Sequence, residues 1–218
     1  NKDNIEMILK KYGKESDVAR VRIFGEFPKG ALDSFISLET VELATEKQIS
    51  DSLFNKTTVA HIGVDVARYG DDSTILFPRI ATRALEYEKY SKRSTMETTG
   101  YVINMAKNLM SQYPSIDKVM IKVDDTGVGG GVTDRPEELI EDNQYPFEVF
   151  GVNNGSTSED DFYDNLGTQL WGNIKEMLEE NMTANLNGEQ PIIELPDDGL
   201  LIKELSTRKF KMTSRSRI

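Results

Sequence analysis

Cysteine is absent from the 218-residue chain, and histidine occurs once, as His61. Disulfides and thiolate metal sites are therefore excluded, and so is any site built from several histidines. A Ser-His-Asp triad would depend on His61 alone, and we assign this residue no role. Any metal must be held by oxygen ligands, which favours Mg²⁺, Mn²⁺ or Ca²⁺.

Long apolar runs and a Walker-type phosphate loop are missing too. The longest apolar stretches are far too short to span a bilayer, and no basic, apolar, small-residue leader opens the chain, so we expect no membrane partner. There is no glycine-rich loop ending in Lys-Ser or Lys-Thr, so this chain is not itself a P-loop ATPase.

Charge is plentiful but unevenly spread. The net charge of −11, taken alone, argues against a nucleic-acid partner. Acidic residues gather in SEDDFYD at 158–164, whereas residues 203–218 hold six basic residues and a single acid. This basic C-terminal strip is either a solvated strand face or a surface for phosphate contacts.

The order of elements predicts a mixed α/β fold. Residues 1–57 suggest a lead-in with two short helices, the second of them capped by Ser37. Three consecutive strands are expected after it, and then helices alternate with strands. The expected strands are 58–67, 73–80, 83–91, 118–123 and 146–152, with short ones near 192–195, 200–205 and 208–212. The expected helices are 94–112, 136–142 and 160–182. Ser94 and Glu97 fit a capping box at the start of the first helix, and Phe162 is expected on the core side of the third. This is the ribonuclease H-like order, a mixed β-sheet flanked by helices.

Two aspartates stand out on these strands. Asp65 interrupts an apolar strand, where an unpaired charge is expensive to bury, and Asp124 ends the strand at 118–123. In a ribonuclease H-like sheet these two strands are neighbours, so the carboxylates would repel each other unless a cation lay between them. Two Mg²⁺ or Mn²⁺ ions about 3.5–4 Å apart would activate water and stabilise the leaving 3′ oxygen of a phosphodiester. The alternative is that Asp65 caps a turn or pairs with Arg68.

The loops beside these strands allow more than one interpretation. DDTGVGGGVTD at 124–134 either binds phosphate at a helix N-terminus or lets a helix begin close to the sheet. Asp71 and Asp72 are most simply turn residues, and Asp72 is a further candidate metal ligand.

Four segments together resemble the nuclease domain of the large terminase subunit of tailed bacteriophages and prophages. They are DVARVRIFGEFP at 17–28, HIGVDVARYGDDSTI at 61–75, VDDTGVGGGVTDR at 123–135 and DNLGTQLWGNIKEML at 164–178. The resemblance implies a ribonuclease H-like nuclease domain at 58–218 with an extra C-terminal β-hairpin. Residues 1–57 would then be the linker from an ATPase domain that this chain lacks.

The resemblance also implies an activity, partners and a location. The family is made of divalent-metal-dependent endonucleases that cut concatemeric double-stranded DNA when packaging begins and ends. The implied partners are double-stranded DNA, the small terminase subunit and the portal protein, in the cytoplasm of the bacterial host. We expect the isolated domain to be monomeric.

The resemblance assigns roles to individual residues. Asp65 and Asp124 match the first two catalytic acids, which hold two Mg²⁺ or Mn²⁺ ions in the intact enzyme. The family's third acid lies in a Ser-Pro-Asp or Asp-Ala-Leu segment that is not found before the terminal TSRSRI. We therefore expect a C-terminally incomplete domain that is weak or inactive. Basic residues of the hairpin are candidate phosphate contacts, namely Lys209, Lys211, Arg215 and Arg217.

Two other functions stay open. An actin- or sugar-kinase-like ATP-binding domain could use 124–134 as a phosphate loop, although such proteins have two lobes and RYGDD at 68–72 would present acids to an anion. The second is a catalytically inactive module that docks on the portal or the small terminase subunit.

Overall fold

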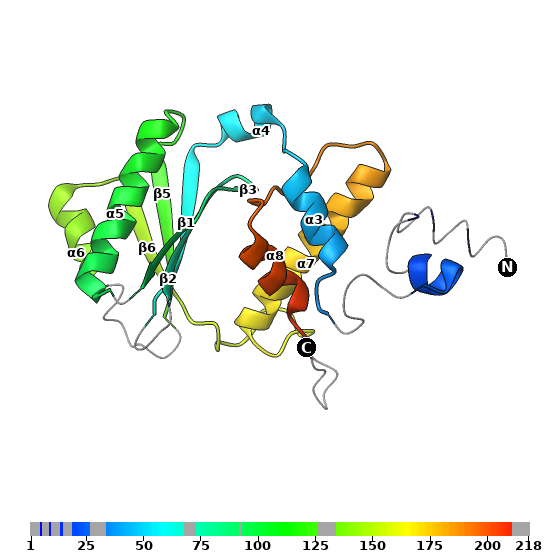
Figure 1. Ribbon diagram of the computed structural model, residues 1–218. Coiled ribbons are helices and arrows are strands. Elements are labelled where there is room, and N and C mark those ends of the chain that lie inside the picture. Colours follow the sequence, from blue (N-terminus) through cyan, green and yellow to red (C-terminus); the bar gives the residue numbers. More distant parts are fainter. Residues whose placement is uncertain are drawn as a thin grey trace. The chain divides into compact units, whose positions relative to one another are not determined.

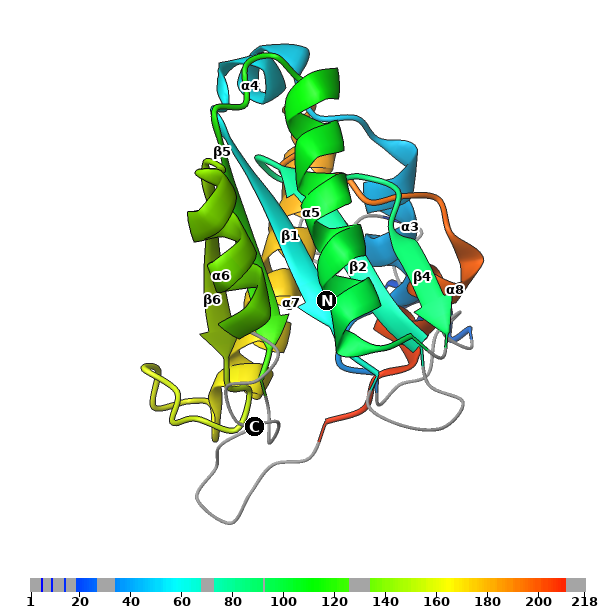
Figure 2. The same cartoon turned by 90° about the vertical axis from the view of Figure 1, so that its left-hand side faces the viewer.

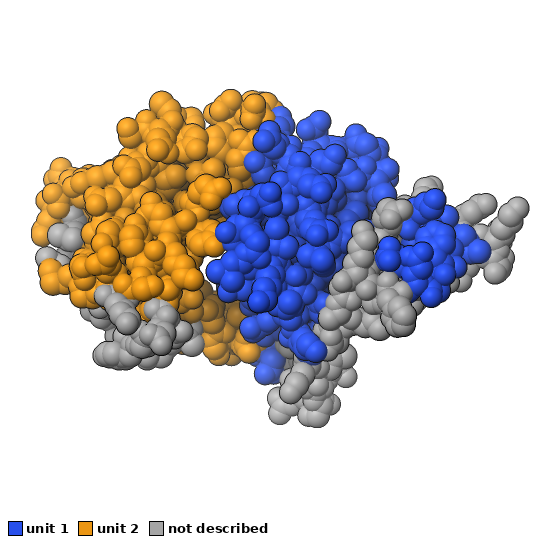
Figure 3. Space-filling model, viewed as in Figure 1, with its two compact units in different colours: residues 1–50, 158–164, 168–218 blue, residues 51–157, 165–167 orange. Residues whose placement is uncertain are grey.

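The computed structural model describes residues 19–26, 34–67, 73–91, 93–125 and 134–210, together with positions 5, 9 and 14. The first predicted helix falls almost wholly outside these residues. The chain forms two compact units, of which one contains residues 51–157 and 165–167 and the other contains residues 1–50, 158–164 and 168–218 (Figure 3). The boundary predicted between residues 57 and 58 stays a prediction.

A six-stranded mixed sheet is the framework of the unit formed by residues 51–157 and 165–167. Four strands lie where the sequence predicts them. They are β1 (Val59–Asp65), β2 (Ser73–Ile80), β5 (Lys118–Asp124) and β6 (Phe147–Val152). The strand predicted over 83–91 is divided into β3 (Arg83–Ala84) and β4 (Glu88–Ser91), which both pair with β2.

The strand order is β3-β2-β1-β5-β6. β2 runs antiparallel to β1, whereas β1, β5 and β6 are parallel to one another. The predicted adjacency of the first strand and the strand at 118–123 is therefore confirmed. Parallel neighbours present their carboxyl ends at the same edge of the sheet, which is where open α/β sheets hold their ligands.

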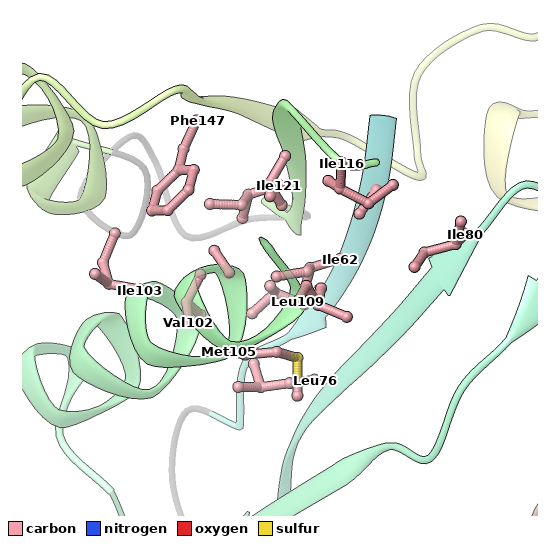
Figure 4. Close-up of a cluster of buried hydrophobic side chains, with 14 of the residues drawn as sticks. Ile62, Leu76, Ile80, Val102, Ile103, Met105, Leu109, Ile116, Ile121 and Phe147 are labelled. Carbon is pink, nitrogen blue, oxygen red and sulfur yellow. The ribbon is translucent and has the colours of Figure 1, made fainter. Parts of the chain in front are cut away.

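One face of this sheet is covered by α5 (Thr95–Gln112) and α6 (Asp134–Asn143), as Figure 2 shows. The core between the sheet and these helices is apolar, with Ile62 of β1, Ile121 of β5 and Met105 of α5 all buried (Figure 4). β1 and β5 bury every second residue on this face, because side chains alternate along a strand. A further helix, the short α4 (Asp51–Lys56), contributes Phe54 to the same core.

The start of α5 follows the local sequence. Ser94 is the N-cap: its hydroxyl accepts the Glu97 backbone N–H at 3.3 Å, and the Glu97 carboxylate accepts the Ser94 backbone N–H at 3.0 Å. This reciprocal pair satisfies two N–H groups that the first turn of a helix leaves without partners. The predicted capping box is confirmed.

The other unit is mainly helical (Figure 1). Its elements are a short π-helix (η1, Arg20–Phe24), α3 (Leu38–Glu46), most of α7 (Leu166–Leu186) and α8 (Gly199–Thr207). Ser37 caps α3 through the Thr40 backbone N–H, as predicted. The segment after α7 is fixed to its neighbours by the Leu195 N–H, which donates to the Ala44 carbonyl at 2.9 Å.

One expectation about the C-terminal part is wrong. The segment predicted as a strand at 200–205 lies in α8, because Asp198 accepts the Leu201 N–H at 2.8 Å and so caps a helix. An apolar run this short fits a strand or a helix, and here the cap decides. Lys209 forms an isolated bridge with Ser34. Residues 211–218 lie outside the described part of the chain, so the expected C-terminal β-hairpin stays a prediction. Within that part, no helix is both long enough and apolar enough to cross a membrane.

Candidate metal and active site

Asp65 and Asp124 are the last residues of β1 and β5. In the parallel pairing of these strands Val64 lies opposite Val123, so the next residue of each strand is an aspartate at a matching position. Val64 and Val123 are buried in the core, and both aspartates therefore point to the opposite face. Adjacent strands lie about 4.8 Å apart. The structure thus brings the two carboxylates side by side, while their role as metal ligands stays a prediction.

The environment of Asp65 differs from the expectation that it is buried. Its side chain is exposed, and that of Asp124 is half-buried. Asp65 ends β1 on the face away from α5 and α6, so the charge remains in water and the burial penalty does not arise. Side chains alternate along β1, so the apolar residues on either side of Asp65 point into the core while Asp65 itself points away from it.

Asp124 is held by a residue that follows the next parallel strand. Asn154 lies in the turn after β6, and its Nδ2 donates to Asp124 Oδ2 at 2.9 Å. An ionised carboxylate can only accept, so the amide must present its NH₂ group rather than its oxygen. The carboxyl ends of three parallel strands therefore contribute to this edge of the sheet.

The turn that carries Asn154 is braced from both sides. Asn153 Oδ1 accepts the Gly155 N–H at 2.9 Å, and the Asn153 carbonyl accepts the Ser156 N–H at 3.0 Å. The first residues of α7 close the turn, because the Gly167 N–H donates to the Asn154 carbonyl at 2.8 Å. Asn154 is thus fixed through its backbone as well as its side chain.

The same sheet face also carries positive charge. Lys122 precedes Asp124 by two residues and is exposed, and Arg79 of β2 lies opposite His61 of β1. Burial, helped by the charges of Arg79 and Lys122, lowers the pKa of His61 to about 4, so the imidazole is neutral at pH 7. His61 lies four residues before Asp65 on the same face, about 13 Å along the strand, which is too far to share a metal with it.

The donor set fits an oxygen-bound cation. Two carboxylates that converge from neighbouring strands suit Mg²⁺ or Mn²⁺, which prefer carboxylate oxygens and water. Among the described residues, no third His, Cys, Asp or Glu joins them in a cluster that could hold a metal. Asp72 and the glycine-rich segment at 126–133 lie outside the residues that the structure describes.

The predicted DNA contacts are far in sequence from Asp65 and Asp124. Lys209 is exposed in the mainly helical unit, whereas the aspartates belong to the sheet unit. Lys211, Arg215 and Arg217 are not among the described residues. The basic C-terminal strip therefore stays a prediction.

Asn154 and Lys122 are not among the site residues predicted from the sequence. A polar turn, VNNGS at 152–156, follows a predicted strand, and the carboxyl ends of parallel strands share an edge, so the sequence held a usable indication for Asn154. Lys122 shares a face with Asp124 by simple alternation. Both indications become specific only when the strand order is known.

Neither the family models nor the curated proteins compared with this sequence give a match. The comparison with solved structures does give matches. The nuclease domain of the large terminase subunit gp2 of bacterial virus Sf6 has a TM-score of 0.63 at 16% identity, over 84% of this chain and 85% of that one. A mutant of that domain, solved with manganese and beta-thujaplicinol, gives 0.63 at 15% identity over the same shares. The large terminase nuclease of thermophilic phage G20c with bound cobalt gives 0.50 at 13% identity, over 83% and 84%. At these identities the likeness establishes the fold, and the ribonuclease H-like fold predicted from the sequence is confirmed.

Proposed function

We propose that this chain is the nuclease domain of a viral large terminase subunit, and that it hydrolyses phosphodiester bonds of double-stranded DNA with Mg²⁺ or Mn²⁺. The pairing of Asp65 and Asp124, at matched ends of parallel strands and on one face, carries the proposal. The fold shared with terminase nuclease domains supports it, as does the manganese or cobalt present in structures of those proteins.

Divalent ions, when bound, would supply Lewis acidity and would hold a water that ionises more readily than bulk water. The chain's own residues have three tasks. Asp65 and Asp124 provide oxygen ligands and concentrate negative charge at the open edge of the sheet. Asn154 fixes the carboxylate of Asp124 through its amide. Lys122 is exposed on the same face and attracts the phosphate backbone of DNA. This attraction offsets the repulsion between the phosphates and the two aspartates.

We further propose the biological setting that the sequence resemblance implies. The intact protein would cut concatemeric DNA when packaging begins and ends, in the cytoplasm of a bacterial host. An ATPase domain would precede the lead-in at 1–57, the nuclease domain would start at residue 58, and the small terminase subunit and portal would be partners. Lys209, Lys211, Arg215 and Arg217 are the proposed DNA contacts outside the sheet, and the isolated domain would be a monomer.

The ATP-binding alternative depends on the loop at 124–134, of which residues 126–133 lie outside the described residues. The docking module would keep the fold but need no convergent carboxylates. The side-by-side aspartates favour the nuclease over the docking module, because two carboxylates held together repel each other unless a cation lies between them. An ATP-binding domain would also bind Mg²⁺ through carboxylates, and it is the fold shared with terminase nuclease domains that favours the nuclease over it.

Plasmid nicking tests the proposal. Supercoiled plasmid is incubated with the protein and Mn²⁺ or Mg²⁺, and with EDTA in a parallel reaction. Wild type should nick slowly and in a metal-dependent way, since the family's third acid is not found before the terminal TSRSRI. Asp65→Asn or Asp124→Asn should lower the rate by at least about 100-fold, because losing a ligand harms a site more than losing an outer partner does.

Asp117→Asn is the matched control, since Asp117 is an exposed acid just before the opposite end of β5. It should nick like wild type. ATP hydrolysis with intact plasmid, or nicking that persists in both aspartate variants, would contradict the nuclease proposal.

A further inference from the structure

We infer that Asn154 is a positioning residue of the metal site: its amide fixes the carboxylate plane of Asp124 so that the aspartate is preorganised to bind a cation. The inference rests on the proposed function and adds a residue that neither the sequence motifs nor the resemblance assigns. The observation behind it is the 2.9 Å hydrogen bond from Asn154 Nδ2 to Asp124 Oδ2, between two half-buried side chains.

The chemistry of this bond suits a ligand-positioning role. A hydrogen bond to an ionised acceptor is stronger than a neutral one, so Asn154 restricts rotation of the carboxylate about its last torsion. An amide does this without adding charge. A lysine or arginine at the same place would neutralise the carboxylate and compete with the cation, whereas the amide leaves the negative charge available for it.

The position of Asn154 is itself tightly determined. Its carbonyl accepts the Gly167 N–H at 2.8 Å, and the next turn residue, Gly155, is bound by Asn153 Oδ1 at 2.9 Å. The amide thus projects from a braced turn rather than from a free loop. Such support is what a ligand-positioning residue needs, because an error of a fraction of an ångström would be passed on to the ligand.

Gly167 shows how close this packing is. A Cβ atom at position 167 would lie 3.2 Å from both the Cβ and the carbonyl oxygen of Asn154, which is tighter than ordinary contact. A glycine at this site lets the start of α7 approach the turn and reach the Asn154 carbonyl. The glycine, the turn and the amide together form one support for Asp124.

A purely structural role for Asn154 has different consequences. If the residue only stabilised the connection between β6 and α7, its loss would lower the stability of the fold and leave metal affinity unchanged. Ser156 is the control position for Asn154. Its hydroxyl donates to the Asn153 carbonyl at 2.8 Å in the same turn, and this hydrogen bond does not involve Asp124.

Mn²⁺ binding by isothermal titration calorimetry separates the two roles. Asn154→Ala should bind Mn²⁺ about 10–100-fold more weakly than wild type, as expected when a partner of a metal ligand is lost. Asn154→Gln, which keeps the amide on a longer side chain, should recover part of the loss. Ser156→Ala should bind within about twofold of wild type, since the positioning bond is untouched. In nicking assays, Asn154→Ala should lower kcat and leave the KM for DNA nearly unchanged.

Asn154→Ser guards against a variant that fails to fold. Serine is favoured in turns but is too short to reach Asp124 Oδ2, so it should lose as much Mn²⁺ affinity as the alanine variant. Wild-type affinity in both Asn154→Ala and Asn154→Ser, or an equal loss in Ser156→Ala, would overturn the inference alone. Binding by wild type that is no tighter than by Asp124→Asn would overturn the metal site, and the inference with it.

Discussion

Replacing Gly172 with alanine should destabilise the mainly helical unit, although the same change stabilises most helices. Gly172 is buried in α7, and an added Cβ would lie 2.6 Å from Cε1 of Tyr163 and closer still to its Cζ and hydroxyl oxygen, well inside van der Waals contact distance. The Tyr163 ring is itself buried and packs edge-on against Phe162 with ring centroids 5.2 Å apart. It therefore has little room to move away.

The expected magnitude follows from two opposing terms. Alanine gains about 1 kcal/mol over glycine in a helix interior. The Cβ atom stands about 1 Å inside the usual carbon–carbon separation, so the overlap should cost about 3 kcal/mol, the upper end of the range for overpacked cores. The net loss is about 2 kcal/mol, or about 4–8 °C in Tm for a chain of this size.

Gly100→Ala is the matched control. Gly100 is an exposed residue of α5, and an added Cβ would meet nothing within 4 Å, so this variant should be about 1 kcal/mol more stable than wild type. Urea unfolding followed by circular dichroism measures both variants. The fluorescence of Trp171, the single tryptophan, reports separately on the unit that contains Gly172. Stabilisation of Gly172→Ala would refute the packing described for Tyr163.

Three further outcomes can be measured independently. NMR of the single histidine should give a midpoint near pH 4, because burial and the charges of Arg79 and Lys122 lower the pKa of His61, and Lys122→Met should raise that midpoint. Since the folded-state pKa lies below the ordinary histidine value of 6.5, the stability that neutral His61 contributes is present above pH 6.5 and is lost as the pH falls toward 4. A midpoint near 6.5 would contradict the environment described. Ser94→Ala should cost about 1 kcal/mol in urea unfolding through loss of the α5 cap, and an unchanged midpoint would argue against the cap. Mn²⁺ at 100 times its Kd should stabilise the protein by about 2.7 kcal/mol, reversibly with EDTA, and Asp124→Asn should show no such rise in Tm.

The sequence predicted structure correctly where an element is determined by residues that are close together in the chain. The Ser94–Glu97 capping box and the Ser37 cap are each set by side chains three residues apart, and both form as predicted. The strand at 118–124 is bounded and apolar on one face, and it too lies where predicted. Such features need no knowledge of distant segments.

Predictions failed where local patterns were ambiguous. The run at 200–205 fits either period, and the Asp198 cap makes it helical. Phe162 was expected in a helix with its ring in the core. The helix begins only at Leu166, because the Asp160 side chain accepts the Phe162 N–H in a turn, and Phe162 is exposed.

By itself, the sequence determined that any metal must be bound by oxygen, and it singled out Asp65 and Asp124 as the acids to consider. Only the tertiary structure decided that the two carboxylates share an edge and a face, since strand pairing joins residues almost sixty positions apart. The pairing of β5 with β6 places Asn154 beside Asp124. The tertiary structure also shows that Asp65 is exposed rather than buried, because which side of a strand faces the core is a property of the sheet and not of the strand.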